Sequence, residues 1–514
     1  MLCVPSVISN GWAEDVTILS YGANKDGKTV NTVAVQRAID ACFSSGGGRV
    51  LVPSGVFVCG TIYLRSGVNL VIEQGAVLKG SDQLSDYRAV KGTPALIVAQ
   101  DVDHIAISGQ GVIDGNGHAS NFQKGDNGRG RPMLIFFVDC RHVTVSGIHL
   151  RSPAFWTEKY SGCEDVRVTG ISVYAHANWN NDGIDIDSKN VVVSDCIFDT
   201  DDDAICLKSE RDAPCENVTI TNCVAASNCN AIKMGTASRG GFQNINISGI
   251  TIHAASEDNI RHWRKSLKGI TADKTVISGI AIEDVDGGHT NQINISHIVM
   301  RSVQTPIFIR LGDRHQPAGS LEQVMISDVI ATSESEMCNV IAGIPGVPVE
   351  GVRIHHMLMI AHAASDKLPL LADMPENTQG YPENRMFGTT LPAGGFFIRH
   401  AKDIQLEDIS VKSAPGETRP FLAAEDVRML AVSRSSYAPG EGAYARMFRL
   451  RDVADVVIAP LPFSGASEKL IAIEGHASGI RVYLDKMTAA RDVVSAEQRM
   501  PLKDVIKIIA PGGR

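Results

Sequence analysis

Along most of the chain, apolar and polar residues alternate in short segments, and one short sequence motif, here called the phrase, recurs. Each copy has two apolar residues separated by one residue, then a small polar residue, then usually Gly, Asn or Asp. Copies begin at positions 105, 143, 166, 191, 218, 245, 293, 324, 352 and 404. Such alternation predicts a short strand, and the Gly, Asn and Asp residues that follow predict turns.

The spacing of these phrases predicts the architecture. The copies that begin at 143, 166, 191, 218 and 245 are 23 to 27 residues apart, with no helical pattern between them. A strand-only repeat of this length predicts one turn of a coiled parallel sheet, whereas propeller blades repeat at about 40 residues or more. We therefore expect an all-β fold, a single parallel β-helix. The 48 residues between 245 and 293 predict one coil with an insertion near residues 256–275.

The N-terminal part contains the one segment with helical spacing, at residues 31–42, which Gly46-Gly47-Gly48 ends. We expect this helix to cover the open end of the coil stack, where strand edges would otherwise be exposed. The expected organisation has four parts. They are a tail or signal-peptide remnant (1–15), an N-terminal strand and capping helix (16–60), the β-helix catalytic domain (61–415) and irregular final coils or a C-terminal cap of the same domain (416–514).

Composition and charge exclude several classes of protein. The chain has 514 residues, 48 of them glycine, and only 5% aromatic residues, which favours a repeat architecture over several globular domains. A net charge of -9 argues against nucleic-acid binding, and no apolar run approaches the roughly 18 residues that a membrane span needs. The mildly apolar first residues are consistent with a trimmed export signal, so we expect an extracellular or periplasmic protein. Nothing in the sequence indicates an oligomeric state.

The cysteines do not predict a disulfide framework or a zinc site. Their number is odd, eleven, and they lack the paired spacing of zinc ligands. We expect the cysteines inside Val- and Ile-rich segments to be small buried apolar residues. These are Cys196, Cys206, Cys223 and Cys229.

Aligning the coils on their apolar residues gathers acidic side chains. Ile184, Ile205 and Ile232 align at steps of 21 and 27 residues. Neighbouring strands lie about 4.8 Å apart, so Asp182, Asp202 and Asp203 fall within one small patch. Like charges so close raise one another's pKa, which leaves one acid protonated and another ionised. Glycoside hydrolysis requires this division. The alternative is a solvated Asp-rich turn, or a capping of the β-helix bends that resembles an asparagine ladder, and we favour this alternative for Asp201 alone.

A second column of charged positions follows from the same alignment. It contains Asp187, Lys208, Gly235, Glu283 and Arg310. The column fits a solvated charge ladder, whose individual pairs are weak. Lys208, Lys233 and Arg310 fit a site for an acidic sugar equally well.

At these positions the sequence resembles glycoside hydrolase family 28, the polygalacturonase and rhamnogalacturonase family of right-handed parallel β-helices. The resemblance extends from about Tyr21 to about Arg314. The family's G-x-G-x-I-D-G turn appears as Gly109 to Gly115. Its N-T-D motif appears as Asn180-Asn181-Asp182, and its G-D-D motif as Asp201-Asp202-Asp203.

The resemblance implies an inverting hydrolase that cleaves an α-glycosidic bond in a pectic polysaccharide. Asp202 would be the general acid, and Asp182 and Asp203 would position and deprotonate water. It implies no metal and no cofactor. The substrate-binding residues that we expect are Asn230, Lys208, Lys233, Asp185, Glu283, Arg261 and Arg310.

Two departures from the family pattern bear on the substrate. Asn230 stands where polygalacturonases have a histidine near the acid. The family's R-I-K triplet falls on Ala281-Ile282-Glu283 by the coil register, or on Arg261-His262-Trp263 within the insertion. In the first register Glu283 would repel a uronate, which favours rhamnogalacturonan or another branched pectic structure over plain endo-cleavage of homogalacturonan.

Two other functions fit a β-helix. A polysaccharide lyase would use the acids to hold calcium and Lys208 or Lys233 as its base. A non-catalytic carbohydrate-binding β-helix would not need clustered acids. Further residues near the expected site are candidate sugar contacts, namely Trp156, Trp179, Trp263, Arg314 and His315.

Overall fold

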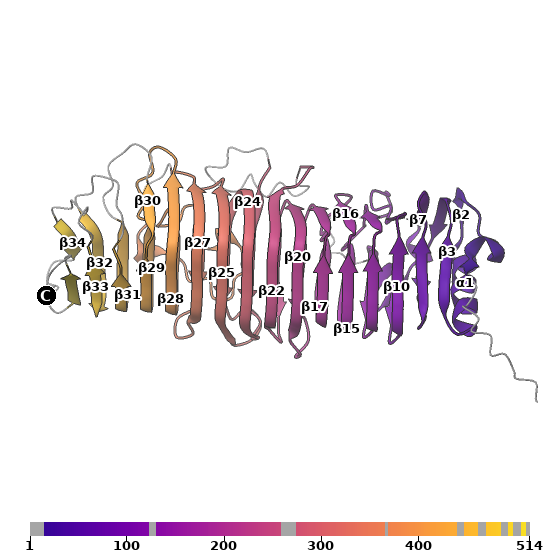
Figure 1. Ribbon diagram of the computed structural model, residues 1–514, viewed down its shortest axis with the longest axis horizontal. Coiled ribbons are helices and arrows are strands. Elements are labelled where there is room, and N and C mark those ends of the chain that lie inside the picture. Colours follow the sequence, from indigo (N-terminus) through magenta and orange to yellow (C-terminus); the bar gives the residue numbers. More distant parts are fainter. Residues whose placement is uncertain are drawn as a thin grey trace, which may run out of the picture.

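The computed structural model describes residues 15–122, 130–258, 274–364, 369–438, 447–460, 469–484, 492–496 and 505–509, which form a long stack of coils (Figure 1). The helix α1 (Thr32–Ser44) lies at one end, and the last strands lie at the other. The described strands belong to a single sheet, and they pair in parallel except for β8 with β9. The predicted all-β class is confirmed.

The strands are short in the first coils and longer afterwards. The first third contains β1 (Val16–Thr17), β2 (Asp26–Val30), β3 (Gly48–Val52), β4 (Gly55–Cys59), β5 (Ile62–Tyr63), β6 (Val68–Ile72), β7 (Ala76–Gly80), β8 (Arg88–Val90), β9 (Thr93–Gln100), β10 (Asp103–Gly109), β11 (Val112–Asp114), β12 (Met133–Val138), β13 (Arg141–Ser146) and β14 (His149–Arg151). The middle contains β15 (Glu158–Thr169), β16 (Ser172–Ala175), β17 (Ile184–Ser194), β18 (Ile197–Thr200), β19 (Ile205–Ser209), β20 (Cys215–Ser227), β21 (Asn230–Ser238), β22 (Phe242–Ala254), β23 (Val276–Asp284), β24 (His289–Leu311), β25 (Ser320–Ser333), β26 (Asn339–Ala342) and β27 (Val349–Ala361). The last part contains β28 (Phe396–Ser413), β29 (Leu422–Ser433), β30 (Ser436–Ala438), β31 (Phe448–Ile458), β32 (Lys469–Ser478), β33 (Ile480–Tyr483), β34 (Asp492–Ala496) and β35 (Ile506–Ile509), and single 3-10 turns occur at Ile18–Tyr21, Leu84–Asp86, Leu371–Asp373 and Asn384–Phe387.

The recurring phrases of the sequence are neighbours on successive coils. Val143 pairs with Val166, which pairs with Val191, and the series continues in register to Ile404. Ile245 pairs directly with Ile293, so the longer step between them is one coil with an insertion, as the spacing predicts. The inserted residues 259–273 lie outside the described part of the chain.

Alternation explains why these segments become strands of a coil. Along much of β20, β22 and β24 buried residues alternate with more exposed ones, and the alternation is interrupted where the coil bends. The buried apolar residues join one continuous core. The turns are held by stacked asparagines, since Asn217 donates to Asn190 (3.0 Å) and Asn244 donates to Asn217 (2.8 Å). This asparagine ladder lies at a different turn from the clustered aspartates.

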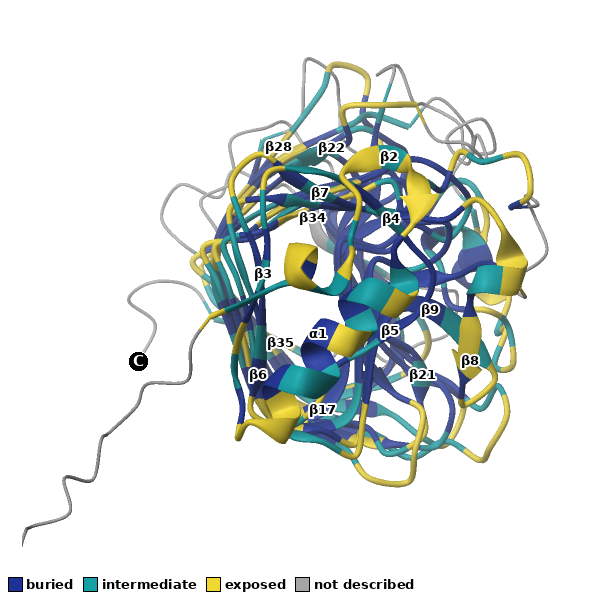
Figure 2. Ribbon diagram, turned by 90° about the vertical axis from the view of Figure 1, so that its right-hand side faces the viewer, coloured by how far each residue is buried: buried dark blue, intermediate teal, exposed yellow. Residues whose placement is uncertain are grey.

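The predicted N-terminal helix is present. Seen along the stack, α1 lies over the N-terminal end (Figure 2), and it buries Val35, Ala38, Ile39 and Cys42 in the common core. Its role as a cap and the handedness of the coils stay predictions.

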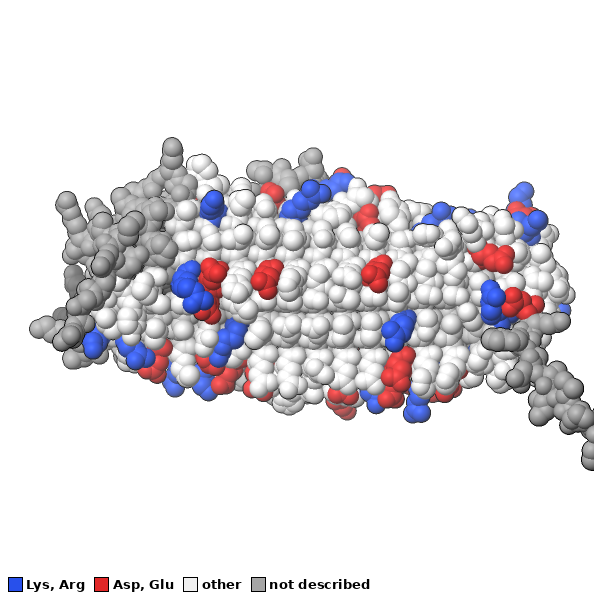
Figure 3. Space-filling view, viewed as in Figure 1, with Lys and Arg blue, Asp and Glu red and all other residues white. Residues whose placement is uncertain are grey.

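The surface and the cysteines agree with the sequence. On the face seen in Figure 3, charged side chains are scattered among uncharged ones. Within the described residues, no helix is long and apolar enough to cross a membrane. Ten cysteines are described, and all ten are buried free thiols, including the four that the sequence singled out.

Candidate active site

The predicted alignment of the coils is confirmed at the clustered acids. Ile184 pairs with Ile205, and Ile205 pairs with Ile232. Asp182 and Asp203 each stand two residues before one of these isoleucines, at the junction where a turn enters β17 or β19. Because the isoleucines face the core and fix the register, the turns deliver the aspartates to one place.

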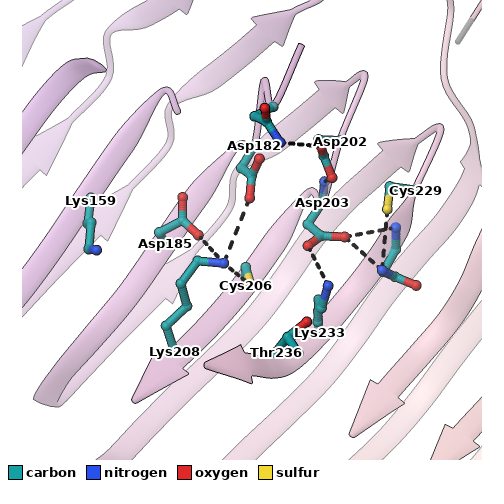
Figure 4. Close-up of polar contacts among 12 residues, drawn as sticks. Lys159, Asp182, Asp185, Asp202, Asp203, Cys206, Lys208, Cys229, Lys233 and Thr236 are labelled. Carbon is teal, nitrogen blue, oxygen red and sulfur yellow. Dashed lines mark hydrogen bonds and ion pairs between the residues drawn. The ribbon is translucent and has the colours of Figure 1, made fainter. Parts of the chain in front are cut away.

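All three predicted catalytic aspartates line one cavity of about 360 Å³. Figure 4 shows Asp182, Asp202 and Asp203 side by side above two lysines. The complete lining consists of Trp156, Asn180, Asp182, Asp202, Asp203, Lys208, Glu210, Cys229, Asn230, Lys233, Thr236, Ala237, Ile277, Tyr381, Pro382 and Glu383.

Asp203 is held as a carboxylate. Its Oδ2 lies 3.0 Å from Lys233 Nζ, and its Oδ1 accepts from Asn230 Nδ2 at 2.8 Å and from the Asn230 backbone N–H at 3.2 Å. Burial alone would raise the pKa of Asp203, but the charges of Lys233 and Lys208 and the Asn230 hydrogen bond outweigh it, so the pKa lies below its ordinary value. Asn230, which replaces the family histidine, therefore supports the ionised form of Asp203.

Asp182 has the opposite tendency. Burial raises its pKa well above the ordinary value, and the negative charges of Asp185 and Asp202 raise it further. Lys208 Nζ is 3.9 Å away and offsets only part of this effect. The cluster thus combines one acid whose pKa is raised with one whose pKa is lowered.

Asp202 is positioned by its own backbone and by neighbouring coils. Its carbonyl oxygen accepts from Thr200 Oγ1 (2.6 Å) and from Ser227 Oγ (2.7 Å). Its carboxylate accepts from the Asp203 backbone N–H (3.1 Å) and from Asn180 Nδ2 (3.4 Å). These bonds fix the side chain at the surface of the cavity.

Lys208 and Lys233 are buried charges on the cavity floor. Lys208 Nζ lies 3.1 Å from Asp185 Oδ1 and 4.7 Å from the centre of the Trp156 ring. Burial disfavours the charged form of both lysines, but the carboxylates around them hold the pKa of each well above its usual range. Asp185, which faces Lys208 beneath the floor, has a pKa raised to about 6 because it is buried.

Three of the predicted substrate contacts do not line the cavity, namely Asp185, Glu283 and Arg310. The coil register behind the first placement of the R-I-K triplet is confirmed, since Lys233 pairs with Ala281 and Met234 with Ile282, whereas the second placement, at residues 261–263, lies outside the described residues. Glu283 is nevertheless buried behind Lys233, with Oε2 3.8 Å from Nζ, so it does not face a substrate. Arg310 is fully buried and donates to backbone carbonyls at residues 343, 376 and 377. Arg261 and Trp263 lie outside the described residues.

Sequence reasoning missed several residues of the cavity. Tyr381, Pro382 and Glu383 come from the segment between β27 and β28, far along the chain from the acids. Glu210, whose Oε1 is 2.7 Å from Lys159 Nζ, was missed as well. Lys159 and Glu210 lie two coils apart, with β17 between β15 and β19, so no local pattern points to that pair, and none points to Tyr381.

One group of donors in the cavity has the spacing of metal ligands. Single ligand atoms of Asp202, Asp203 and Cys229 lie within 4.8 Å of one another. Burial and the charge of Asp203 raise the pKa of the Cys229 thiol well above its ordinary value, and a thiol binds metal only after losing its proton. Lys233 already neutralises Asp203, so the set suits proton transfer better than metal binding.

Comparisons with known proteins point to one family. The profile of glycosyl hydrolases family 28 matches residues 42–357. A probable polygalacturonase of Vitis vinifera is 25% identical over 395 residues, which cover 70% of this chain and 76% of that protein. An exo-poly-alpha-D-galacturonosidase of Dickeya chrysanthemi is 27% identical over 296 residues, 45% of this chain and 49% of that protein. An exopolygalacturonase structure from Thermotoga maritima shares the fold, with a TM-score of 0.57 at 22% identity over 68% of this chain and 87% of that one.

Proposed function

The chain belongs to glycosyl hydrolases family 28 and is therefore a glycosidase, and we propose that it hydrolyses an α-glycosidic bond of a pectic polysaccharide or oligosaccharide with inversion of the anomeric carbon. The observation that carries the proposal is the meeting of Asp182, Asp202 and Asp203 in one cavity, where one pKa is raised and another is lowered.

Each of the three aspartates has a separate role in the proposed reaction. Asp202 gives its proton to the glycosidic oxygen as the bond to the anomeric carbon breaks. Asp203, which Lys233 and Asn230 keep ionised, takes a proton from the water that attacks the opposite face of the sugar. Asp182 positions that water and, because its pKa is raised, holds a proton that it passes to Asp202 after each turnover. Asp203 then releases to solvent the proton it took from water, and Asp182 takes one up from solvent, which restores all three groups.

A galacturonate-containing chain of the galacturonan or rhamnogalacturonan type is the proposed substrate class. The named relatives, a probable polygalacturonase and an exo-poly-alpha-D-galacturonosidase, support a pectic substrate. Lys208 and Lys233 place two positive charges on the cavity floor, and these charges attract the carboxylate of an acidic sugar. Glu283 does not oppose this, because it is buried behind Lys233.

The lysines that a lyase mechanism would use as bases are unsuited to that role. A base must be neutral to accept a proton, and a useful base has a pKa near the working pH. Asp185 and Asp203 hold the pKa values of Lys208 and Lys233 well above the usual lysine range. Hydrolysis is therefore the reaction that the titrating groups support best.

Product chemistry tests this proposal. The enzyme is incubated with homogalacturonan, rhamnogalacturonan and xylogalacturonan, and new reducing ends and ultraviolet absorbance are followed together. We expect reducing ends from at least one polymer without the absorbance of an unsaturated uronate. An absorbing product that disappears with chelator would instead establish a lyase.

The pKa shifts predict the pH profile of kcat/KM. Activity falls at low pH when Asp203 becomes protonated, and the lowered pKa puts this limb below the ordinary carboxyl range of about 4. Activity falls at high pH when Asp182 loses the proton that it passes to Asp202, and the raised pKa of Asp182 puts this limb well above that range. A profile that declines steadily from pH 4 to pH 6 would contradict the raised pKa of Asp182.

Asn230→Asp is expected to move only the acidic limb. The change removes the Nδ2 donor to Asp203 and adds a like charge beside it, and both effects raise the pKa of Asp203. The acidic limb should therefore shift upward by about one pH unit or more. An unshifted limb in a folded variant would show that Asp203 is not the group that titrates there.

We also propose that the coil stack is a right-handed parallel β-helix whose N-terminal end α1 covers. Residues 16–60, 61–415 and 416–514 would be successive parts of one domain. In-register pairing of β28 with β29, β29 with β31 and β31 with β32 supports the continuity of the last part. Because the proposed substrate is a polymer outside the cell, we propose an extracellular or periplasmic location.

A further inference from the structure

A segment that lies outside the family match forms one end of the cavity. Residues 369–395, here called the return segment, leave the coils after β27 and rejoin them at β28. The family profile ends at residue 357, so Tyr381, Pro382 and Glu383 are added to the cavity by a part of the chain that the profile does not cover. This end of the site therefore lies outside the part of the chain that the profile matches.

The column of residues beneath the cavity shows where the return segment begins to cover the sheet. Paired residues on successive coils run Asp185, Cys206, Lys233, Ala281, Phe308, Val340, Phe397 and Ala423. The column contains the charged residues Asp185 and Lys233 at its start and only apolar residues after Lys233. From Phe308 onward it packs against Leu371, Met374, Met386, Phe387 and Leu391 of the return segment.

Buried polar contacts hold the segment in this position. Arg310 donates to the carbonyls of Glu376 and Asn377 at 3.0 and 3.1 Å, and Arg399 pairs with the Glu376 carboxylate at 2.6 Å. Asn384 Nδ2 donates to Gln304 Oε1 at 3.0 Å. Both arginines are almost fully buried, which makes the segment a fixed wall of the cavity.

Tyr381 is the part of this wall that meets the polar floor. Its hydroxyl oxygen accepts from Lys233 Nζ at 3.4 Å, and its side chain stays 57% exposed. Lys233 and Arg314 lie 5.6 and 5.8 Å from the ring centre. Lys233 lies on the coil after Asp203 and is also its ion-pair partner, so Tyr381 contacts the coil next to that of the proposed base.

We propose that the return segment ends the substrate groove beside the catalytic acids, so that the enzyme removes a short piece of fixed length from one end of a pectic chain, with Tyr381 contacting the terminal sugar. This inference rests on the proposed hydrolysis. A sugar chain that lies along the cavity floor from Asp203 towards the C-terminal coils meets Tyr381. Beyond Tyr381 the return segment packs on the sheet, so the sheet surface there is covered and does not bind further sugars. An exposed aromatic ring suits the face of a terminal sugar.

The test is the product pattern from an oligogalacturonide of about ten units and from the polymer. The wild-type enzyme should release one short product from the first time point, with little loss of viscosity. A ladder of many lengths at the start would overturn the proposal while leaving hydrolysis intact. Failure to release reducing ends from any pectic substrate would instead refute the proposed function itself.

Two variants distinguish a role of the return segment in substrate binding from a role in folding. Tyr381→Ala is expected to raise KM about 2- to 10-fold, the range of one aromatic contact, with kcat nearly unchanged. Replacing residues 379–383 with two glycines should open the groove and add longer products. Tyr483→Ala, a change of a partly exposed tyrosine on β33, is the matched control and should leave both kinetics and products unchanged. If Tyr381→Ala and the variant shortened at residues 379–383 both keep the wild-type KM, products and melting temperature, the proposed role of the return segment is wrong.

Discussion

Asp202→Asn is expected to lower kcat by about 10²- to 10⁴-fold, the contribution of a positioned general acid, while oligosaccharide affinity stays within a few-fold. Asparagine has the size of aspartate and keeps an oxygen that accepts from the Asp203 backbone N–H, but it has no proton to give to the leaving oxygen. The measurement is kcat on the best pectic substrate together with calorimetric binding of an oligogalacturonide.

Asp201→Asn is the matched control for that variant. Asp201 is adjacent in sequence and equally buried, but it is absent from the cavity lining, and its carboxylate accepts from Asn228 at 3.4 Å. It should retain turnover within a few-fold. Full activity of Asp202→Asn, or an equal loss in both variants, would refute the assignment of Asp202 as the general acid.

Lys208→Met is expected to destabilise the protein by about 3–5 kcal/mol at pH 7, the usual cost of removing one partner of a buried ion pair. Lys208 is the ion-pair partner of Asp185, which has no exposed surface, and it also lies 3.9 Å from Asp182. Without the lysine, a buried carboxylate is left uncompensated. Urea unfolding followed by far-ultraviolet circular dichroism measures the change.

The pH dependence of this loss has a definite sign. The pKa of Asp185 is already about 6, and removing Lys208 raises it further, so Asp185 becomes neutral on acidification. A neutral acid costs less to bury, so the destabilisation should be smaller at pH 5 than at pH 7. Adding Asp185→Asn to Lys208→Met should restore part of the lost stability at pH 7.

The exposed pair of Lys189 with Glu164, at 3.0 Å, provides the control for Lys208→Met. Lys189→Met should cost less than about 1 kcal/mol, because solvent screens a pair of which the lysine is nearly half exposed. Equal losses at both positions, or a Lys208→Met loss that grows on acidification, would contradict the role given to Asp185.

The coil register was predictable from the sequence because it depends on local patterns. Each phrase alternates with period two, and a slip of one residue would turn its apolar residues away from the core. Aligning Ile184, Ile205 and Ile232 was therefore enough to bring Asp182 and Asp203 together, and the pairings confirm that alignment. The same pattern located the insertion between Ile245 and Ile293.

Side-chain burial and long-range packing were not predictable in this way. The alignment placed Glu283 and Arg310 in a column of charges, and they do pair across neighbouring strands. It could not show that both are buried, because that depends on the return segment folding back over the coils. Tyr381 reaches Lys233 across 148 residues of sequence, and the packing of Phe308 and Phe397 against that segment, together with the segment's buried polar contacts, brings it there.

The anomeric configuration of the first product tests the central claim most directly. Nuclear magnetic resonance of an α-linked oligogalacturonide during hydrolysis resolves the new reducing end before it mutarotates. Water activated by Asp203 on the face opposite the leaving oxygen must give the β anomer first. First appearance of the α anomer would mean retention through a covalent intermediate, and would contradict the roles given to Asp202 and Asp203.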